Sequence, residues 1–219
     1  MKKIFIIISA SIFAFGLASC GGKKAGDEKV DEEGVSKSNN PIEALANMGK
    51  DMEEGNNAAQ AKIKERRAKG DTLAMHYEEL MKYLPTSVNG YKAETPDGSS
   101  INMPGSSYST ANVTFRNDKG DDIKITLMDY NAAYEMYSSI TGLWALGMSI
   151  DSPDEKANGV KFEGDIGGWE DYHKKSHDAS LTLGIGYRFW LQVEGSNQES
   201  TEFIKSVAKT MDLAKLSNL

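Results

Sequence analysis

The chain has 219 residues, and its 25 lysines and arginines stand against 32 aspartates and glutamates, which gives a formal net charge of −7. This acidic balance argues against a nucleic-acid partner and against adsorption onto anionic lipid surfaces. Because Cys20 is the only cysteine, a disulfide within the chain is excluded.

The first 20 residues have the order of a processed export signal. Lys2 and Lys3 give a positive start, an apolar run extends from Ile4 to about Gly16, and Leu17-Ala18-Ser19-Cys20 follows. The run is too short to span a bilayer, which needs about 20 residues, and the small residues after it indicate cleavage. The alternative is an ordinary secretory signal with a chance cysteine at its cleavage site.

This segment resembles the signal peptide of bacterial lipoproteins, in which Leu-Ala-Ser-Cys is the lipobox. The resemblance implies that Cys20 becomes the first residue of the mature chain and carries a diacylglycerol and an amide-linked acyl chain such as palmitate. About two acyl chains are enough for a stable membrane anchor. Removal of residues 1–19 takes away Lys2 and Lys3 and no acidic residue, so the mature chain has a net charge of −9.

The residue after Cys20 is Gly21 rather than aspartate. In Gram-negative lipoproteins an aspartate at this position favours retention in the inner membrane, so the resemblance implies the outer membrane. The expected location is the cell envelope, facing the periplasm or the cell surface. A Gram-positive host with a single membrane stays open as an alternative.

Four segments are expected along the chain: the signal peptide at 1–19, the lipidated cysteine and a disordered tether at 20–40, a polar helical spacer at 41–70, and a globular domain at 71–219. Residues 21–40 contain no aromatic residue, which is typical of disorder. A helix break is expected at Gly55-Asn56-Asn57. Beyond it, residues 58–69 have Ile63 as their one large apolar side chain, so this stretch is expected to be solvated.

The first elements of the domain are expected to be a helix, a loop and a hairpin. A helix from about Asp71 to Leu84 follows from the spacing of its apolar residues, and Pro85 ends it. The Gly/Ser/Pro-rich stretch around residues 98–109 is expected to be a loop. Apolar residues then alternate with polar ones over 111–116 and 123–127, and the turn between them places Gly120 in the left-handed conformation.

A helix from about Asn131 to Gly147 follows, with this inward stripe: Ala133, Tyr137, Ile140, Trp144 and Met148. Short strands are expected at 160–166 and 169–175. Strict alternation from Leu181 to Val193 predicts either a three-residue loop at Gly184-Ile185-Gly186 or one long bent strand. A closing helix from Glu199 to Leu213 has these residues inward: Phe203, Ile204, Val207 and Met211.

The elements predict an α+β fold, in which an antiparallel sheet from two strand-strand-strand-helix halves has helices packed against it. N-terminal helices and the tether precede it. The order resembles the PsbP/Mog1-like α/β/α folds over about residues 85–215. No motif carries this resemblance, and it implies no catalytic residue.

The sequence contains no motif for catalysis, for a metal or for a cofactor, so no residue is assigned to any of these roles. His173 and His177 are spaced as His-x-x-x-His, but they fall in an expected hairpin loop, where Lys174 and Lys175 oppose a cation. The glycines at 184 and 186 lack the final glycine of the dinucleotide fingerprint.

Aromatic residues give the candidate contact surface. The alternation places Trp190 on the polar face of its strand, with Arg188 and Gln192, where an indole is either covered by a helix or exposed as a contact site. Tyr108, Trp169 and Trp190 are the residues predicted to form this surface.

The sequence therefore indicates a lipid-anchored envelope protein without enzymatic activity, held to the membrane by the lipid on Cys20. Its expected partner is an envelope protein or a small ligand, and not a nucleic acid. One alternative is an envelope hydrolase whose site is assembled from dispersed carboxylates and His173. Another is a structural role in which the helix at 58–69 docks to an envelope partner.

Overall fold

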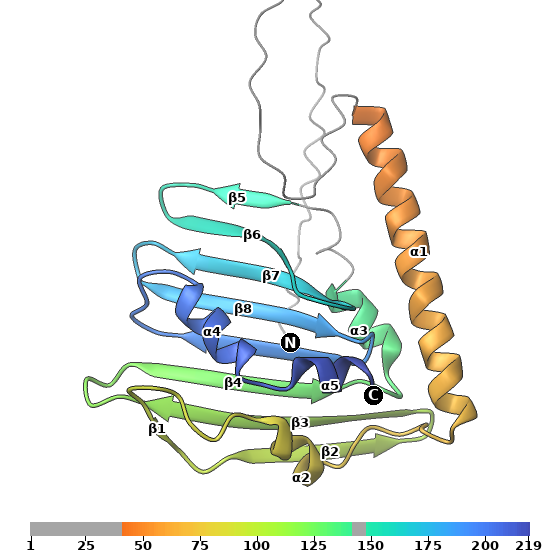
Figure 1. Ribbon diagram of the computed structural model, residues 1–219, viewed down its shortest axis with the longest axis horizontal. Coiled ribbons are helices and arrows are strands. Elements are labelled where there is room, and N and C mark those ends of the chain that lie inside the picture. Colours follow the sequence, from red (N-terminus) through yellow and green to blue (C-terminus); the bar gives the residue numbers. More distant parts are fainter. Residues whose placement is uncertain (1–40, 142–147) are drawn as a thin grey trace, which may run out of the picture. The chain divides into compact units, whose positions relative to one another are not determined.

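The computed structural model describes residues 41–141 and 148–219 (Figure 1). The predicted lipobox with Cys20, the predicted tether, and Trp144 of the predicted helix at 131–147 lie outside these residues. In the part of the chain that the structure describes, no helix is both long enough and apolar enough to cross a membrane.

The described residues form one antiparallel sheet with helices packed against it, which confirms the predicted α+β class (Figure 1). Its strands are β1 (Lys92–Ala93), β2 (Asp97–Met103), β3 (Ser106–Arg116), β4 (Asp122–Asp129), β5 (Ser149–Asp151), β6 (Glu155–Lys161), β7 (Ile166–His173), β8 (Asp178–Ile185) and β9 (Phe189–Gly195). They lie in the order β1-β3-β4-β9-β8-β7-β6-β5, and β2 also pairs with β3. The strands before and after the helix α3 (Tyr134–Thr141) therefore meet where β4 pairs with β9.

The predicted hairpin between β3 and β4 is confirmed. The backbone N–H of Asn117 donates to the carbonyl of Asp121 at 3.0 Å, and Gly120 has φ 90°. Cross-strand pairs such as Val113 with Ile125 place the alternating apolar side chains of both strands on one face. That face is buried, as period-two alternation requires.

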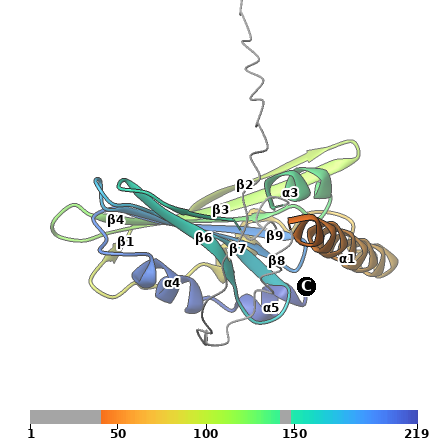
Figure 2. The ribbon, with the colours of Figure 1, turned by 90° about the horizontal axis from the view of Figure 1, so that it is seen from above.

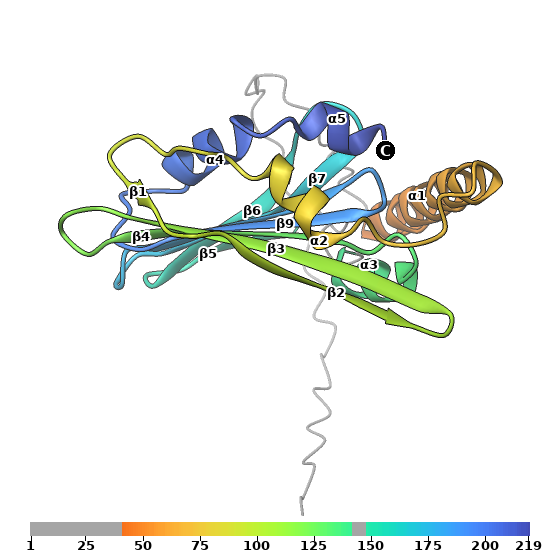
Figure 3. The ribbon, with the colours of Figure 1, turned by 90° about the horizontal axis from the view of Figure 1, so that it is seen from below.

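Helices cover this apolar face. Figure 3 shows α2 (Tyr77–Leu80), α4 (Glu202–Lys209) and α5 (Leu213–Ser217) on one side of the sheet and α3 on the other, and Figure 2 shows α4 and α5 apart from α3 in the same way. The fully buried side chains of this core include Phe115, Ile123, Ile125, Leu127, Leu181, Leu183, Ile185, Phe189, Leu191 and Ile204.

The predicted helix at 71–84 is wrong for its first half. Only α2 and a short 3-10 helix (Met81–Tyr83) form, and Leu73 is 61% exposed. Asp71 does not cap a helix, because its carboxylate binds Arg188. The closing helix is also shorter than predicted and is divided into α4 and α5, although Ile204, Val207 and Met211 are buried.

The predicted loop around residues 98–109 is also wrong, because most of it forms the hairpin of β2 and β3. Ser100 and Ser109 face each other at 2.9 Å, and Ser107 accepts a hydrogen bond from the backbone of Ala74 at 2.6 Å. These hydroxyls hold the segment before α2 against the sheet.

The turn between β8 and β9 lies later than predicted. Ile185 pairs with Phe189, so the loop is residues 186–188. A Cβ on Gly186 would lie 2.8 Å from the carbonyl oxygen of Ser217. Only glycine fits this close approach of α5, and Gly186 also has φ 60°. Ile185, which ends β8, is fully buried in the core.

The helix α1 (Pro41–Ala68) is continuous, so the predicted break at Gly55-Asn56-Asn57 is wrong. Ala59, Ile63 and Arg66 are buried, and their spacing places them on one stripe of the helix. Lys62 pairs with Asp165 at 2.7 Å. The stretch expected to be solvated thus packs one side against the domain.

Candidate functional site

The three aromatic residues predicted as a contact surface lie on the same face of the sheet. Tyr108 on β3 and Trp190 on β9 alternate with buried core residues of their strands. Trp169 on β7 pairs with Thr182, which alternates with the buried Leu181 and Leu183. All three therefore occupy the face opposite the main core, and all three are partly exposed.

The region around Trp190 is covered by α3. A second, smaller cluster consists of buried Tyr130, Ala133 and Tyr137, with these partly buried residues packed against it: Tyr108, Met128, Tyr134, Tyr187 and Trp190. A Cβ on Gly184 would lie 2.5 Å from the phenol oxygen of Tyr137, so the glycine makes room for α3 on the sheet. Trp190 is thus a half-covered residue that supports α3, and its indole nitrogen is buried without an acceptor.

Burial in this cluster shifts the acid–base properties of its phenols. Burial raises the pKa of Tyr137 above its ordinary value, and the neighbouring Tyr134 adds to the effect. Burial also raises the pKa of Tyr130, Tyr134 and Tyr187. Burial therefore favours the neutral form of these four phenols.

A row of uncharged polar side chains crosses the sheet beside this cluster. Direct cross-strand pairs link Thr126 on β4 to Gln192 on β9, Gln192 to Thr182 on β8, and Thr182 to Trp169 on β7. Directly paired residues share a face of the sheet, and all four side chains are partly exposed. We call Thr126, Gln192, Thr182 and Trp169 the neutral row.

Charged residues border the neutral row on the side away from the aromatic cluster around Trp190. Lys124 and Glu194 pair across β4 and β9 with 3.8 Å between their charged atoms, and Asp171 lies 3.1 Å from His173. Within the described residues, no ion pair involves a member of the neutral row. The row therefore offers hydroxyl groups, a carboxamide and an indole, without net charge.

A buried ion network, which the sequence analysis missed, lies at the end of β4. Arg188 donates from Nε and Nη2 to the two carboxylate oxygens of Asp129 at 2.9 and 2.6 Å, and from Nη1 to Asp71 at 2.7 Å. Asp129 is fully buried. One signal was available: Asp129 continues the core-facing phase of Ile123, Ile125 and Leu127.

The same network holds the end of α1. Arg66 donates to the side chain of Asn131 at 2.9 Å and to the carbonyls of Gly186 and Tyr187 at 3.4 and 3.3 Å. Asn131 in turn donates to the carboxylate of Asp71 at 2.7 Å. All of these groups have partners, so the network is suited to holding α1 and the segment after it in place.

The surroundings shift the pKa values of the two arginines in opposite directions. Burial alone would lower the pKa of Arg188, but the hydrogen bonds and charges of Asp129 and Asp71 raise it above its usual value. Burial, followed by the charge of Arg188, lowers the pKa of Arg66. Arginine stays protonated in proteins, so the network contains two positively charged side chains, Arg66 and Arg188, beside the carboxyl groups of Asp71 and Asp129.

The histidine pair lies at the turn between β7 and β8. His173 and His177 are exposed, and His177 lies 2.9 Å from the hydroxyl of Tyr172. Among the described residues, no three histidine, cysteine, aspartate or glutamate side chains are grouped so that they could hold a metal ion.

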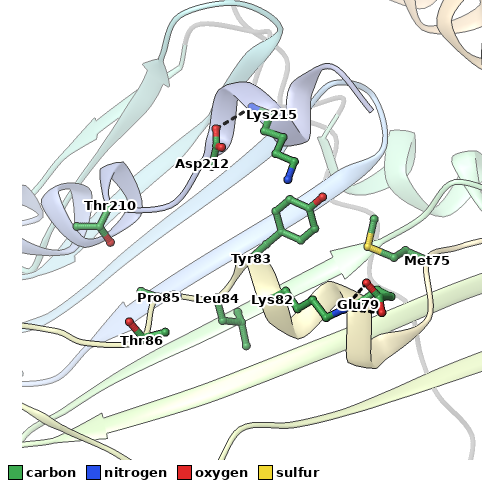
Figure 4. A pocket seen from close by; sticks show the side chains of 10 residues that line it. All are labelled: Met75, Glu79, Lys82, Tyr83, Leu84, Pro85, Thr86, Thr210, Asp212 and Lys215. Atoms are coloured by element: carbon green, nitrogen blue, oxygen red, sulfur yellow. Dashed lines mark hydrogen bonds and ion pairs between the residues drawn. The ribbon is translucent and has the colours of Figure 1, made fainter.

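A groove of about 570 Å³ lies between α2 and α5 (Figure 4). Its charged side chains are already engaged: Lys82 binds Glu79 at 2.6 Å, the ammonium of Lys215 lies over the ring of Tyr83, and Asp212 accepts from the backbone of Lys215. The charged side chains of the groove are therefore engaged within the protein itself. We take the neutral row, which includes one of the predicted contact residues, Trp169, as the candidate site.

Comparison with known proteins adds no relative: no protein-family model matches the chain, and neither a curated protein nor a solved structure gives a significant match. The resemblance to PsbP/Mog1-like folds therefore stays a prediction.

Proposed function

We propose that the chain is a lipid-anchored protein of the bacterial cell envelope that binds an envelope component on the sheet face carrying Tyr108, Trp169 and Trp190. The order of residues in the segment that ends at Cys20 supports the anchor. The neutral row on a partly exposed sheet face, next to an aromatic cluster, is the observation that carries the binding role.

A hydrolase of dispersed carboxylates has less support. Such a site requires a carboxyl group whose pKa is raised, so that it can act as an acid. The carboxylates of the groove between α2 and α5 already bind groups of the protein itself.

Lipidation is tested by metabolic labelling with palmitate. The wild-type chain should incorporate the label, and a Cys20→Ala variant should not. Equal labelling of both chains would contradict the anchor.

Binding is tested by mild crosslinking in the native envelope and recovery of the protein with its attached material. We expect one dominant component, protein or glycan, to be recovered with the wild-type chain and lost with Cys20→Ala. Its recovery should also fall with Trp169→Ala, whereas Lys92→Ala, an exposed change on β1, should leave it unchanged. If no component depends on Trp169, the proposed face is wrong.

A further inference from the structure

The neutral row has the chemistry of a surface for sugars. Thr126 and Thr182 supply hydroxyl groups that both donate and accept hydrogen bonds, and Gln192 supplies a carboxamide. Trp169 ends the row with an indole, the largest flat apolar surface that a side chain offers. Sugar rings need this combination, because they carry hydroxyl groups around their edge and C–H groups on their faces.

The geometry of the row favours an extended ligand. The row runs across β4, β9, β8 and β7, and three strand spacings of about 4.8 Å make it about 14 Å long. Beyond Trp169 the next strand presents Gly159, which is exposed and has no side chain to block the indole. A chain of several sugar rings can therefore lie along the row.

The borders of the row restrict the charge of this ligand. On one side of the row, Lys124 pairs with Glu194, and Asp171 adds a carboxylate beside His173. On the other side, burial keeps the phenol of Tyr137 uncharged. A nucleic acid or an anionic lipid surface would meet no basic group in the row itself. An uncharged polymer meets no charged side chain in the row itself.

We propose that the neutral row binds a glycan strand of the cell wall, a neutral backbone whose rings carry hydroxyl and acetamido groups. The carboxamide of Gln192 can both donate to and accept from an acetamido group. The inference rests on the proposed function, because the lipid on Cys20 is what would hold the domain near its membrane. Residues 20–40 span about 70 Å when fully extended, which limits how far the start of α1 can lie from that membrane. The cell wall lies within that reach.

The test uses the mature lipidated chain in detergent, with two probes. Purified cell-wall sacculi are tested by co-sedimentation, and a linear hexamer of N-acetylglucosamine is tested by titration calorimetry. Both should bind to the wild-type chain. A hexamer of glucose, which lacks acetamido groups, should bind more weakly, and equal affinity for it would contradict the role assigned to Gln192.

Variants locate the site. Trp169→Ala should weaken binding of the hexamer by about 5- to 10-fold, the loss typical of one aromatic contact, and Trp169→Phe should restore most of it. Thr182→Val removes one hydroxyl and keeps the shape and strand preference of the side chain, so it should weaken binding by about 3-fold. Thr114→Val is the matched control on the same face, outside the row, and should change the affinity by less than about 2-fold.

The outcomes separate this inference from the proposed function. If neither probe binds, or if both row variants bind as the wild type does, the glycan proposal is overturned. If crosslinking in the envelope then still recovers a component that depends on Trp169, the binding function stands and its ligand is of another class. If it recovers none, both proposals fail.

Discussion

The two faces of the sheet differ in what they carry and in what covers them. On one face, fully buried apolar side chains from β3, β4, β8 and β9 pack beneath α2, α4 and α5. On the other face, α3 packs on the sheet around Trp190, and the side chains of the neutral row are partly exposed. The first face holds the larger part of the buried apolar core.

This contrast separates the residues needed for folding from those available for binding. Apolar burial is the main favourable term in folding, and the helix-covered face supplies most of it. The half-exposed indole of Trp169 contributes less to the fold, because it is left partly in water. Trp169, a large aromatic side chain that is left partly in water, is therefore the residue of this face that best indicates a binding role.

The largest loss of stability is expected at the ion network, which lies at the end of β4. Asp129→Asn should lower the free energy of unfolding by about 3–5 kcal/mol, because it leaves Arg188 buried without its main partner. Urea unfolding followed by circular dichroism measures this loss. Asp118→Asn is the matched control: its ion pair with Lys92 is exposed on both sides, so its loss should cost less than about 1 kcal/mol. A similar small cost for both variants would contradict a structural role for the network.

Two adjacent residues of β8 compare the faces directly. Leu183 points into the core and is fully buried, so Leu183→Ala should cost about 2–5 kcal/mol of stability. Thr182 points to the other face, and Thr182→Ala should cost less than about 1 kcal/mol. The same urea titration measures both. Equal costs would mean that the second face is also part of the folding core.

The sequence predicted the parts of the fold in which one local rule is sufficient. The alternation in β3 and β4 and the glycine at position 120 together specify a hairpin and its buried face, and both are confirmed. The side on which Trp190 lies also follows from alternation alone.

Other parts depend on contacts between segments far apart in the chain. The stripe of Ala59, Ile63 and Arg66 looks polar in the sequence, because an arginine is expected at the surface. In the structure Arg66 is buried, since Asn131 and the loop after β8 accept its hydrogen bonds. The serines of β2 and β3 look like loop residues, because hydroxyls favour turns. Their partners, the backbone groups before α2, become known only when the chain is folded.

The neutral row could not be predicted from the sequence for the same reason. Trp169 was identified as a contact residue, but its neighbours Thr182, Gln192 and Thr126 follow from the strand order, in which β9 lies between β4 and β8. Nothing in the local sequence specifies that order. The sequence therefore predicted a single residue of the candidate site, Trp169. The strand order of the sheet was needed to identify the neighbours that form a surface with it.

The two tryptophans of the second face differ in what they pack against, although both are partly exposed. Trp190 packs in the cluster under α3, so Trp190→Ala should lower the free energy of unfolding by about 2–3 kcal/mol. Trp169 lies outside that cluster, and Trp169→Ala should cost about 1 kcal/mol or less. Urea unfolding of the two variants gives both values. The reverse order would show that Trp169, rather than Trp190, is structural, and would remove it from the proposed site.

The smallest effect concerns the pH dependence of stability that comes from Tyr137, the buried tyrosine of α3. Burial holds the pKa of Tyr137 higher in the folded chain than in the unfolded chain, where it is about 10. Above pH 10 the unfolded chain therefore releases a proton that the folded chain keeps, so stability is complete below pH 10 and falls as the pH rises. Each pH unit should remove about 1.4 kcal/mol for this one group, and Tyr137→Phe should reduce that slope. Urea midpoints measured between pH 9 and pH 11 test this, and an unchanged slope in Tyr137→Phe would mean that the cluster opens to solvent before the core unfolds.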